Sequence, residues 1–113
     1  MSEFVDFLLD TLAVMGPVRA RRMFGGHGIY HDDLMFGLVA DDVLYLKADA
    51  ESAPRFIEKN LEPFEYVKNG KAMKMSYYRA PEEIYDDPDE AQRWATLAFA
   101  AAARNRKPRK KGG

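Results

Sequence analysis

The sequence predicts a two-layer α+β fold in which an antiparallel five-stranded sheet packs against helices, in the order α-β-β-β-α-β-β-α. Apolar residues recur at helical spacing near both ends of the chain, whereas the middle holds short apolar runs separated by turn signals. The length of 113 residues allows one core. We therefore expect a single domain over residues 1–104 and a flexible basic tail over residues 105–113.

The opening segment, residues 4–15, has the pattern of an amphipathic helix. Ser2 can cap its start, and Gly16-Pro17 ends it. The apolar stripe of this helix consists of Phe4, Leu8, Leu12 and Met15.

Three glycines fall within four positions next in the chain, at Gly25, Gly26 and Gly28. They allow a bulge or a close crossing of main chain where strands enter the sheet. A nucleotide-binding loop would need the spacing Gly-x-Gly-x-x-Gly or Gly-x4-Gly-Lys-Ser/Thr, and these glycines match neither. We interpret them as structural.

Residues 34–40 and 43–47 are predicted to form a hairpin, because Asp41-Asp42 between them suits a two-residue turn. This turn places Ala40 opposite Val43. One face then carries Met35, Gly37, Val39, Leu44 and Leu46, and the other carries Leu34, Phe36, Leu38, Val43 and Tyr45. Because both faces are apolar, we expect helices on one of them and another element, or a second subunit, on the other.

Asn69-Gly70 predicts a second hairpin with a type I′ turn. The predicted register pairs Lys68 with Lys71, Tyr66 with Met73, and Phe64 with Met75, and it places Glu65 across from Lys74 as an ion pair. Phe64, Tyr66, Met73, Met75 and Tyr77 would share one face.

Two further helices complete the prediction. Residues 49–60 fit a short helix with Pro54 in its first turn and with Phe56 and Ile57 facing inward. The closing helix starts at Asp87-Pro88-Asp89-Glu90, which combines a capping aspartate with proline at the first helical position. Its inner stripe consists of Trp94, Leu97, Ala98 and Ala101.

The composition excludes several classes of protein. Without cysteine the chain has no disulfide, no thiolate nucleophile and no zinc site built on cysteine. No targeting signal is visible, and no apolar run approaches the roughly 18 residues of a membrane span. We expect a cytoplasmic protein that does not associate with membranes.

The net charge of −1 hides an acidic body and a basic end. Residues 1–103 hold 11 basic residues against 18 acidic ones. The end of the chain could give weak, sequence-independent and salt-sensitive contact with nucleic acid. The six basic residues concerned are Arg104, Arg106, Lys107, Arg109, Lys110 and Lys111.

Five motifs occur in order along the chain: Arg22-Met23-Phe24-Gly25-Gly26-x-Gly28-Ile29-Tyr30, Met35-Phe36-Gly37, Leu44-Tyr45-Leu46-Lys47, Pro63-Phe64-x-Tyr66, and Met75-Ser76-Tyr77-Tyr78 followed by Pro81. Over roughly residues 10–104 the chain thereby resembles the TfoX/Sxy amino-terminal domain family. The residues that the resemblance marks are Arg22, Met23, Phe24, Gly25, Gly26, Gly28, Tyr30, Tyr45, Lys47, Tyr77 and Tyr78.

The resemblance implies a two-layer α+β domain of the kind found in bacterial regulators of competence genes, which act as transcriptional coactivators. Full-length members of that type carry a second, helical domain after the first, where the present sequence has its basic stretch. The chain is also similar to stand-alone members of the family without an assigned activity.

Other candidate groups for chemistry have structural interpretations. His27 and His31 near Asp32-Asp33 could bind a metal, but this region has the composition of a turn, and we expect neither metal nor cofactor. Ser76 lacks a recognisable base, so it is interpreted as a strand serine. The acidic pairs Asp41-Asp42 and Asp86-Asp87 suit a turn and a helix cap.

Three hypotheses for function follow. The first is a non-enzymatic regulatory domain that acts by protein–protein contact, either as a homodimer or with another protein. The second is a small-molecule-binding domain or uncharacterised enzyme with a pocket near Tyr66, Tyr77 and Arg22. The third is a nucleic-acid accessory protein acting through the basic tail. Arg19, Arg21 and Arg22 fit a solvated edge strand or, if they converge, an anion grip.

Overall fold

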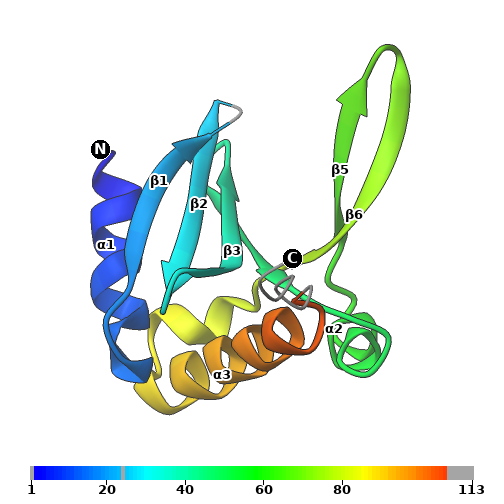
Figure 1. Ribbon diagram of the computed structural model, residues 1–113. Coiled ribbons are helices and arrows are strands. Elements are labelled where there is room, and N and C mark those ends of the chain that lie inside the picture. The colour runs from blue at the N-terminus through cyan, green and yellow to red at the C-terminus, as the bar shows by residue number, and fades with distance from the viewer. Residues whose placement is uncertain (1, 24, 107–113) are drawn as a thin grey trace, which may run out of the picture.

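The computed structural model describes residues 2–23 and 25–106, which form a six-stranded antiparallel sheet with helices on one side (Figure 1). The strand order is β1-β2-β3-β4-β6-β5. The elements are α1 (Glu3–Leu12), the 3₁₀ helix η1 (Ala13–Met15), β1 (Arg19–Met23), β2 (Gly26–His31), β3 (Leu34–Ala40), β4 (Val43–Lys47), α2 (Ala53–Glu58), β5 (Pro63–Lys68), β6 (Lys71–Arg79), the 3₁₀ helix η2 (Glu82–Tyr85) and α3 (Pro88–Arg104).

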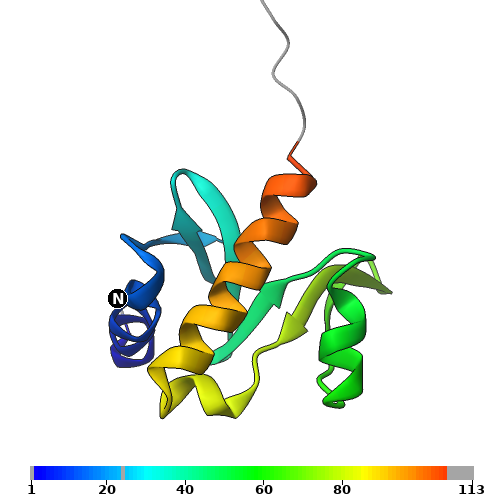
Figure 2. The same ribbon diagram turned by 90° about the horizontal axis from the view of Figure 1, so that it is seen from below.

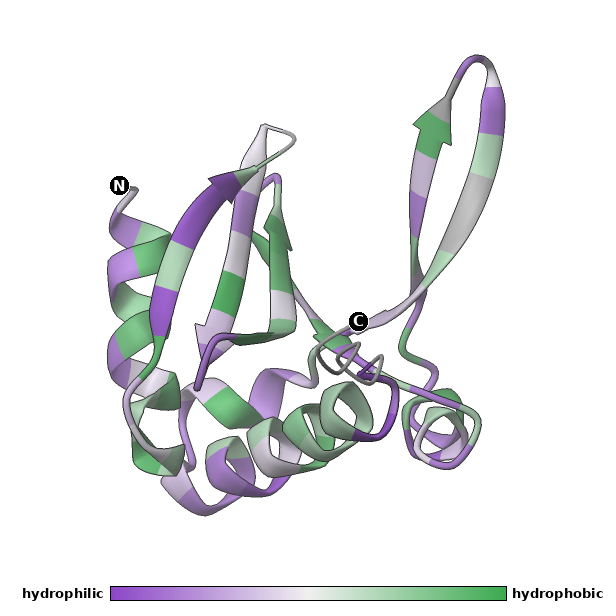
Figure 3. Ribbon diagram, viewed as in Figure 1, coloured by the Kyte–Doolittle hydropathy of each residue, from purple (hydrophilic) through white to green (hydrophobic). Residues whose placement is uncertain are grey.

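The predicted α+β fold is confirmed, but the number of strands was wrong: the sheet has six strands, not five. The additional strand is β1, which pairs with β2 from Arg19 opposite Tyr30 to Met23 opposite Gly26. Its sequence is largely hydrophilic, whereas that of β3 is largely hydrophobic (Figure 3). An edge strand with three arginines shows little of the apolar pattern by which strands are recognised.

Helix α3 crosses beneath the sheet, with α1 and α2 on either side of it (Figure 2). The core lies between this helical layer and the sheet. Its largest fully buried side chains include Phe36, Leu44 and Leu46 from the sheet, Leu8 and Leu12 from α1, and Phe56 from α2. Helix α3 contributes Trp94, Ala98 and Ala101, as its predicted inner stripe requires.

The predicted helix caps are confirmed. The Ser2 hydroxyl accepts a hydrogen bond of 3.2 Å from the Val5 amide, and the Asp87 carboxylate accepts one of 2.9 Å from the Asp89 amide. Two details of α2 were wrong: the helix runs from Ala53 to Glu58 and not over residues 49–60, and Ile57 is 57% exposed. This helix has six residues, of which Phe56 is fully buried and Ala53 also packs against the core.

Both hairpins form at the predicted turns. Asp41 and Asp42 have φ of 50° and 57°, Asn69 has φ of 53°, and Ala40 lies opposite Val43. The turn at Asp32-Asp33 also has positive φ, of 50° and 61°.

A bulge changes the predicted faces of β3. The register between β2 and β3 shifts after the pair of Ile29 with Gly37, so that Tyr30 lies opposite Met35. Phe36 therefore packs with the helices, its ring 6.3 Å from that of Phe99, whereas Met35 lies on the other face. The predicted faces of Met35, Phe36 and also Leu34, which packs against the core on the helix side, were wrong because strict alternation does not pass through a bulge.

A second irregularity lies between Pro63 and Glu65 of β5. Glu65 lies opposite Lys74 and Tyr66 opposite Met73, as predicted, but a bulge replaces the predicted pair of Phe64 with Met75. The side-chain contact predicted for Lys74 falls outside the described side chains. Beyond this bulge the β5–β6 hairpin extends away from the helices, opposite β1–β3 (Figure 1).

Within residues 2–23 and 25–106, no helix combines the length and the apolar character that crossing a bilayer requires.

Candidate functional site

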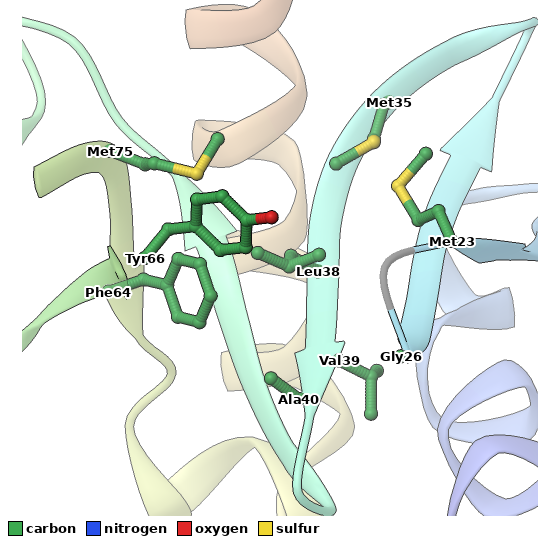
Figure 4. A pocket seen from close by; sticks show the side chains of 9 residues that line it. All are labelled: Met23, Gly26, Met35, Leu38, Val39, Ala40, Phe64, Tyr66 and Met75. Atoms are coloured by element: carbon green, nitrogen blue, oxygen red, sulfur yellow. The ribbon is translucent and has the colours of Figure 1, made fainter. Parts of the chain in front are cut away.

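An apolar cleft of about 140 Å³ lies on the face of the sheet opposite the helices. We call this face the open face. Met23 and Met35 form one wall, Phe64, Tyr66 and Met75 form the other, and Leu38 lies between them (Figure 4). The lining is completed by Gly26, Val39 and Ala40. The cleft thus connects the β1–β3 part of the sheet with the β5–β6 hairpin.

The glycines of β2 make this arrangement possible. A Cβ atom on Gly28 would lie 2.9 Å from the sulfur of Met35 and 3.1 Å from that of Met23, so the missing side chain leaves room for both methionines. A Cβ atom on Gly26 would lie 2.0 Å from the carbonyl oxygen of Val39. These two glycines therefore serve close packing, as the sequence predicts, and Gly25 has φ of 76° in the turn before β2.

Two tyrosines next to the cleft carry cations on their rings. The Arg21 guanidinium lies 5.7 Å from the ring centre of Tyr30, and the Lys47 ammonium lies 5.2 Å from that of Tyr77. Arg19 lies 5.9 Å from the Tyr30 ring and also pairs with Asp33. Such contacts hold a cation over the electron-rich face of each ring.

Tyr77 is only 7% exposed. Burial raises the pKa of Tyr77 to about 12, and the neighbouring Tyr30 adds to the shift. Tyr77 is therefore a neutral phenol at physiological pH, and the Lys47 charge next to it is not cancelled by a phenolate.

Charge is divided between the layers of the molecule. The six strands hold eight of the 17 Lys and Arg residues but only one of the 18 Asp and Glu residues, Glu65. Because Glu65 lies between Phe64 and Tyr66, which both line the cleft, its side chain points away from it. The described strand residues of the open face therefore contribute apolar, aromatic and cationic groups, while Asp33 of the β2–β3 turn pairs with Arg19.

The comparisons with known proteins identify the family. Residues 10–102 match the model of the TfoX N-terminal domain. The chain belongs to this family. It is 29% identical over 100 residues to Protein Sxy of Escherichia coli (strain K12) and 33% identical over 88 residues to DNA transformation protein TfoX1 of Aliivibrio fischeri (strain ATCC 700601 / ES114).

These matches cover 88% and 78% of the chain, but 48% and 42% of the two relatives. The chain thus spans less than half the length of the curated relatives that it matches. The name of the second relative refers to DNA transformation, and neither name denotes an enzyme.

Seven of the eleven residues that the family resemblance marks lie around the open face. Met23 and Gly26 line the cleft, and Tyr45 joins the Phe64 wall with a ring-centre distance of 4.9 Å. The contacts described above involve four more of these residues, Gly28, Tyr30, Lys47 and Tyr77. Tyr78 lies on the helix side instead, where it stacks on Phe56 at 5.3 Å. Phe24 falls outside the described residues.

The pocket predicted near Tyr66, Tyr77 and Arg22 is only partly the one that the structure forms. Tyr66 lines the cleft, Tyr77 borders it through its strand neighbour Met75, and Arg22 is exposed and does not line it. Sequence reasoning missed the contribution of β3, which supplies Met35, Leu38, Val39 and Ala40. The apolar character of both faces of that strand was the available signal.

Arg104, one of the six basic residues predicted to contact nucleic acid, is the last residue of α3. Its guanidinium donates two hydrogen bonds, of 2.7 and 3.0 Å, to the Asp49 carboxylate. The bond from Arg104 holds the pKa of Asp49 well below its usual range. Arg106 is exposed after the helix, whereas Lys107, Arg109, Lys110 and Lys111 lie outside the described residues.

The remaining candidates occupy structural positions. The His31 ring nitrogen Nδ1 lies 2.6 Å from the Pro17 carbonyl oxygen, and its ring packs edge-on against Phe99 at 4.9 Å. Within residues 2–23 and 25–106, no group of three side chains suited to a metal ion was found. Ser76 is an exposed residue of β6 whose carbonyl oxygen accepts a hydrogen bond from the Ala48 amide.

Proposed function

We propose that this TfoX N-terminal domain is a non-enzymatic regulatory module, which acts in the control of competence genes by binding another protein chain through its open face. The observation that carries the proposal is the apolar cleft, in which Met75 remains 40% exposed beside Phe64 and Tyr66. Methionine and aromatic side chains are enriched where proteins bind one another, because they give large and adaptable contact areas.

The size and chemistry of the cleft favour a protein side chain over a metabolite. Its volume of about 140 Å³ is below the roughly 300–1,000 Å³ of ordinary small-molecule sites. Such sites also hold several convergent polar groups, whereas among the described lining residues Tyr66 alone has a polar side chain. One apolar anchor residue of a partner suits this space.

Three of the candidate groups for catalysis make structural contacts instead. His31 contacts Pro17, Asp87 caps α3, and the Asp41-Asp42 pair forms a turn. This supports a binding module, acting in the cytoplasm where transcription takes place. The bound chain is either a second copy of the domain or a different protein.

Paired variants of the β5–β6 hairpin test the proposal. Met75→Glu places a carboxylate in the cleft, whereas Val67→Glu places one on the same hairpin, at a residue that is 65% exposed and does not line the cleft. The full chain carrying each change is expressed in its native cell. Bound proteins are measured by quantitative mass spectrometry, competence transcripts by sequencing, and oligomeric state by light scattering.

We expect Met75→Glu to lose the bound proteins, or the dimer, and to reduce competence transcription at least tenfold, while Val67→Glu resembles the wild type. Circular dichroism establishes that both variants are folded. A folded Met75→Glu variant with unchanged partners and unchanged transcription would contradict the proposal.

A further inference from the structure

The chemistry of the open face indicates what kind of partner it fits. The strands carry one acidic residue, while the loops and helices carry the other 17. The charged strand residues with described contacts on this face, Arg19, Arg21 and Lys47, are all cations, and of these Arg19 is paired with Asp33 of the β2–β3 turn. An apolar cleft beside cations, on a chain that is otherwise acidic, favours partners that combine apolar and acidic side chains.

The cations border the cleft on both of its sides. Tyr30, which carries Arg21, lies next to the methionine wall, since a Cβ atom on Gly28 would contact the side chains of Tyr30, Met23 and Met35 together. Tyr77, which carries Lys47, lies two residues from Met75 on β6. A segment seated in the cleft would therefore pass close to a positive charge at either wall.

We infer that the partner presents an acidic, amphipathic segment, with an apolar side chain inserted between Met35 and Met75 and flanking carboxylates directed at Arg21 and Lys47. This inference rests on the proposed function and adds the chemistry of the partner. Charge complementarity of this kind steers association and selects among partners.

The acidic character of the body does not oppose such a partner at the cleft. At physiological ionic strength the field of an exposed charge is screened beyond about 8 Å. A segment in the cleft therefore interacts mainly with the neighbouring Arg21 and Lys47. The acids of α1, η2 and α3 belong to the layer on the other side of the sheet.

Single-stranded nucleic acid would also be attracted by cations and tyrosines, but the rings are poorly placed for it. Base stacking requires open aromatic faces. Tyr77 is 7% exposed, and the Tyr30 ring has Arg19 and Arg21 over it. The cleft itself suits a single apolar side chain more closely than a base, so an acidic protein segment is favoured.

Labelled peptides of about 12 residues test the inference by fluorescence anisotropy with the full chain. The first alternates Leu and Phe with pairs of Asp and Glu. The second replaces its Leu and Phe by Ser, and the third replaces its acids by Lys. A single-stranded oligothymidine of equal length serves as the nucleic-acid probe, and light scattering records self-association.

We expect the acidic apolar peptide to bind at least tenfold more tightly than each of the other probes, and its affinity to fall as salt is added. Arg21→Glu and Lys47→Glu should each weaken it at least fivefold. Arg55→Glu reverses the charge of an exposed arginine on α2 and should change it less than twofold. Amide shifts of ¹⁵N-labelled protein should concentrate in β3, β5 and β6.

Four results would each overturn the inference. They are equal binding of the basic apolar peptide, tighter binding of the oligothymidine, a dimer broken by Lys47→Glu, and no saturable binding of any peptide. The proposed function is tested separately. If Met75→Glu loses its native protein partner while Lys47→Glu retains it, the cleft binds proteins and the inferred acidic character of the partner is wrong.

Discussion

The two faces of this sheet are both apolar, yet only one of them is closed. On the helix side Phe36, Leu44 and Leu46 are no more than 1% exposed. On the open face Leu38 and Tyr77 are almost as deeply buried, but Met75 beside them is 40% exposed. The helix-side face is part of the hydrophobic core, whereas the open face has buried residues at its base and exposed residues beside them. Substitutions on the helix side should therefore affect stability, and substitutions on the open face should affect binding.

The difference originates in what covers each face. Helix α3 approaches the sheet closely because Ala95, Ala98 and Ala102 have small side chains, and the larger Trp94 and Phe56 fill the remaining space with a ring distance of 5.0 Å. Among the described residues, the open face is bordered by its own β5–β6 hairpin, which lines the cleft together with β3. A hairpin closes the space less completely than a helix, which leaves room for a partner.

The largest effect is expected from matched truncations on the two faces. Phe36→Ala should reduce the free energy of unfolding by about 3–5 kcal/mol, because it leaves a cavity in a fully packed core. Met75→Ala should cost less than about 1 kcal/mol, because the side chain is already partly hydrated. Urea denaturation followed by circular dichroism measures both. Similar losses in the two variants would remove the distinction between core and surface.

The glycines of β2 allow a second comparison. Gly26→Ala should cost about 1–3 kcal/mol, because its Cβ atom would meet the carbonyl oxygen of Val39, which cannot move without separating β2 from β3. Gly28→Ala should cost less, since the neighbouring atoms are the flexible ends of Met35 and Met23. It should nevertheless weaken peptide binding by narrowing the cleft. Thermal unfolding and peptide anisotropy are measured on both variants. A lower stability of Gly28→Ala than of Gly26→Ala would contradict this prediction.

Local patterns predicted the parts of the fold that depend on neighbouring residues. The turns at Asp41-Asp42 and Asn69-Gly70 and the caps at Ser2 and Asp87 depend on a few adjacent side chains, so the sequence was sufficient for them. The bulge at Phe36 depends on how β2 and β3 fit across the sheet, and no local pattern reports it.

The candidate site was predicted only in part, for a related reason. Phe64, Tyr66 and Met75 were placed on one face by alternation within one hairpin. That this hairpin folds opposite β3 is set by the β4–β6 pairing, in which Tyr45 lies opposite Arg79. Residues so far apart in the chain give no common periodic signal, so the wall formed by Met23 and Met35, with Leu38 beside it, became apparent only in three dimensions.

The helical layer contains an ion pair that joins two of its helices. Asp49 accepts hydrogen bonds from Arg104 and from the amides of Glu51 and Ser52, and so joins α3 to the start of α2. Asp49→Ala should cost about 1–2 kcal/mol, as for other capping side chains. Because the folded state lowers the pKa of Asp49, this contribution is complete above about pH 5 and declines as the pH falls below about 4.

Urea denaturation of the wild type and of Asp49→Ala across this range provides the measurement. Their difference in stability should shrink steadily as the solution is acidified. The peptide affinity of Asp49→Ala at neutral pH should equal that of the wild type, because Asp49 does not line the cleft. A constant difference at all pH values would show that Asp49 contributes by packing and not by its charge.

The smallest effect on stability is expected at alkaline pH, from the buried Tyr77 on the open face. Burial raises the pKa of Tyr77 to about 12, whereas an unfolded tyrosine ionises near 10. The folded state therefore holds this proton more tightly, and stability that is present below about pH 10 should decline by about 1 kcal/mol by about pH 11. Tyr77→Phe keeps a ring beneath Lys47 but has no ionisable group, so it should lack this decline. Urea titrations of both proteins at about pH 9 and 11 measure the difference, and an equal alkaline loss in the variant would show that Tyr77 ionises as freely when folded as when unfolded.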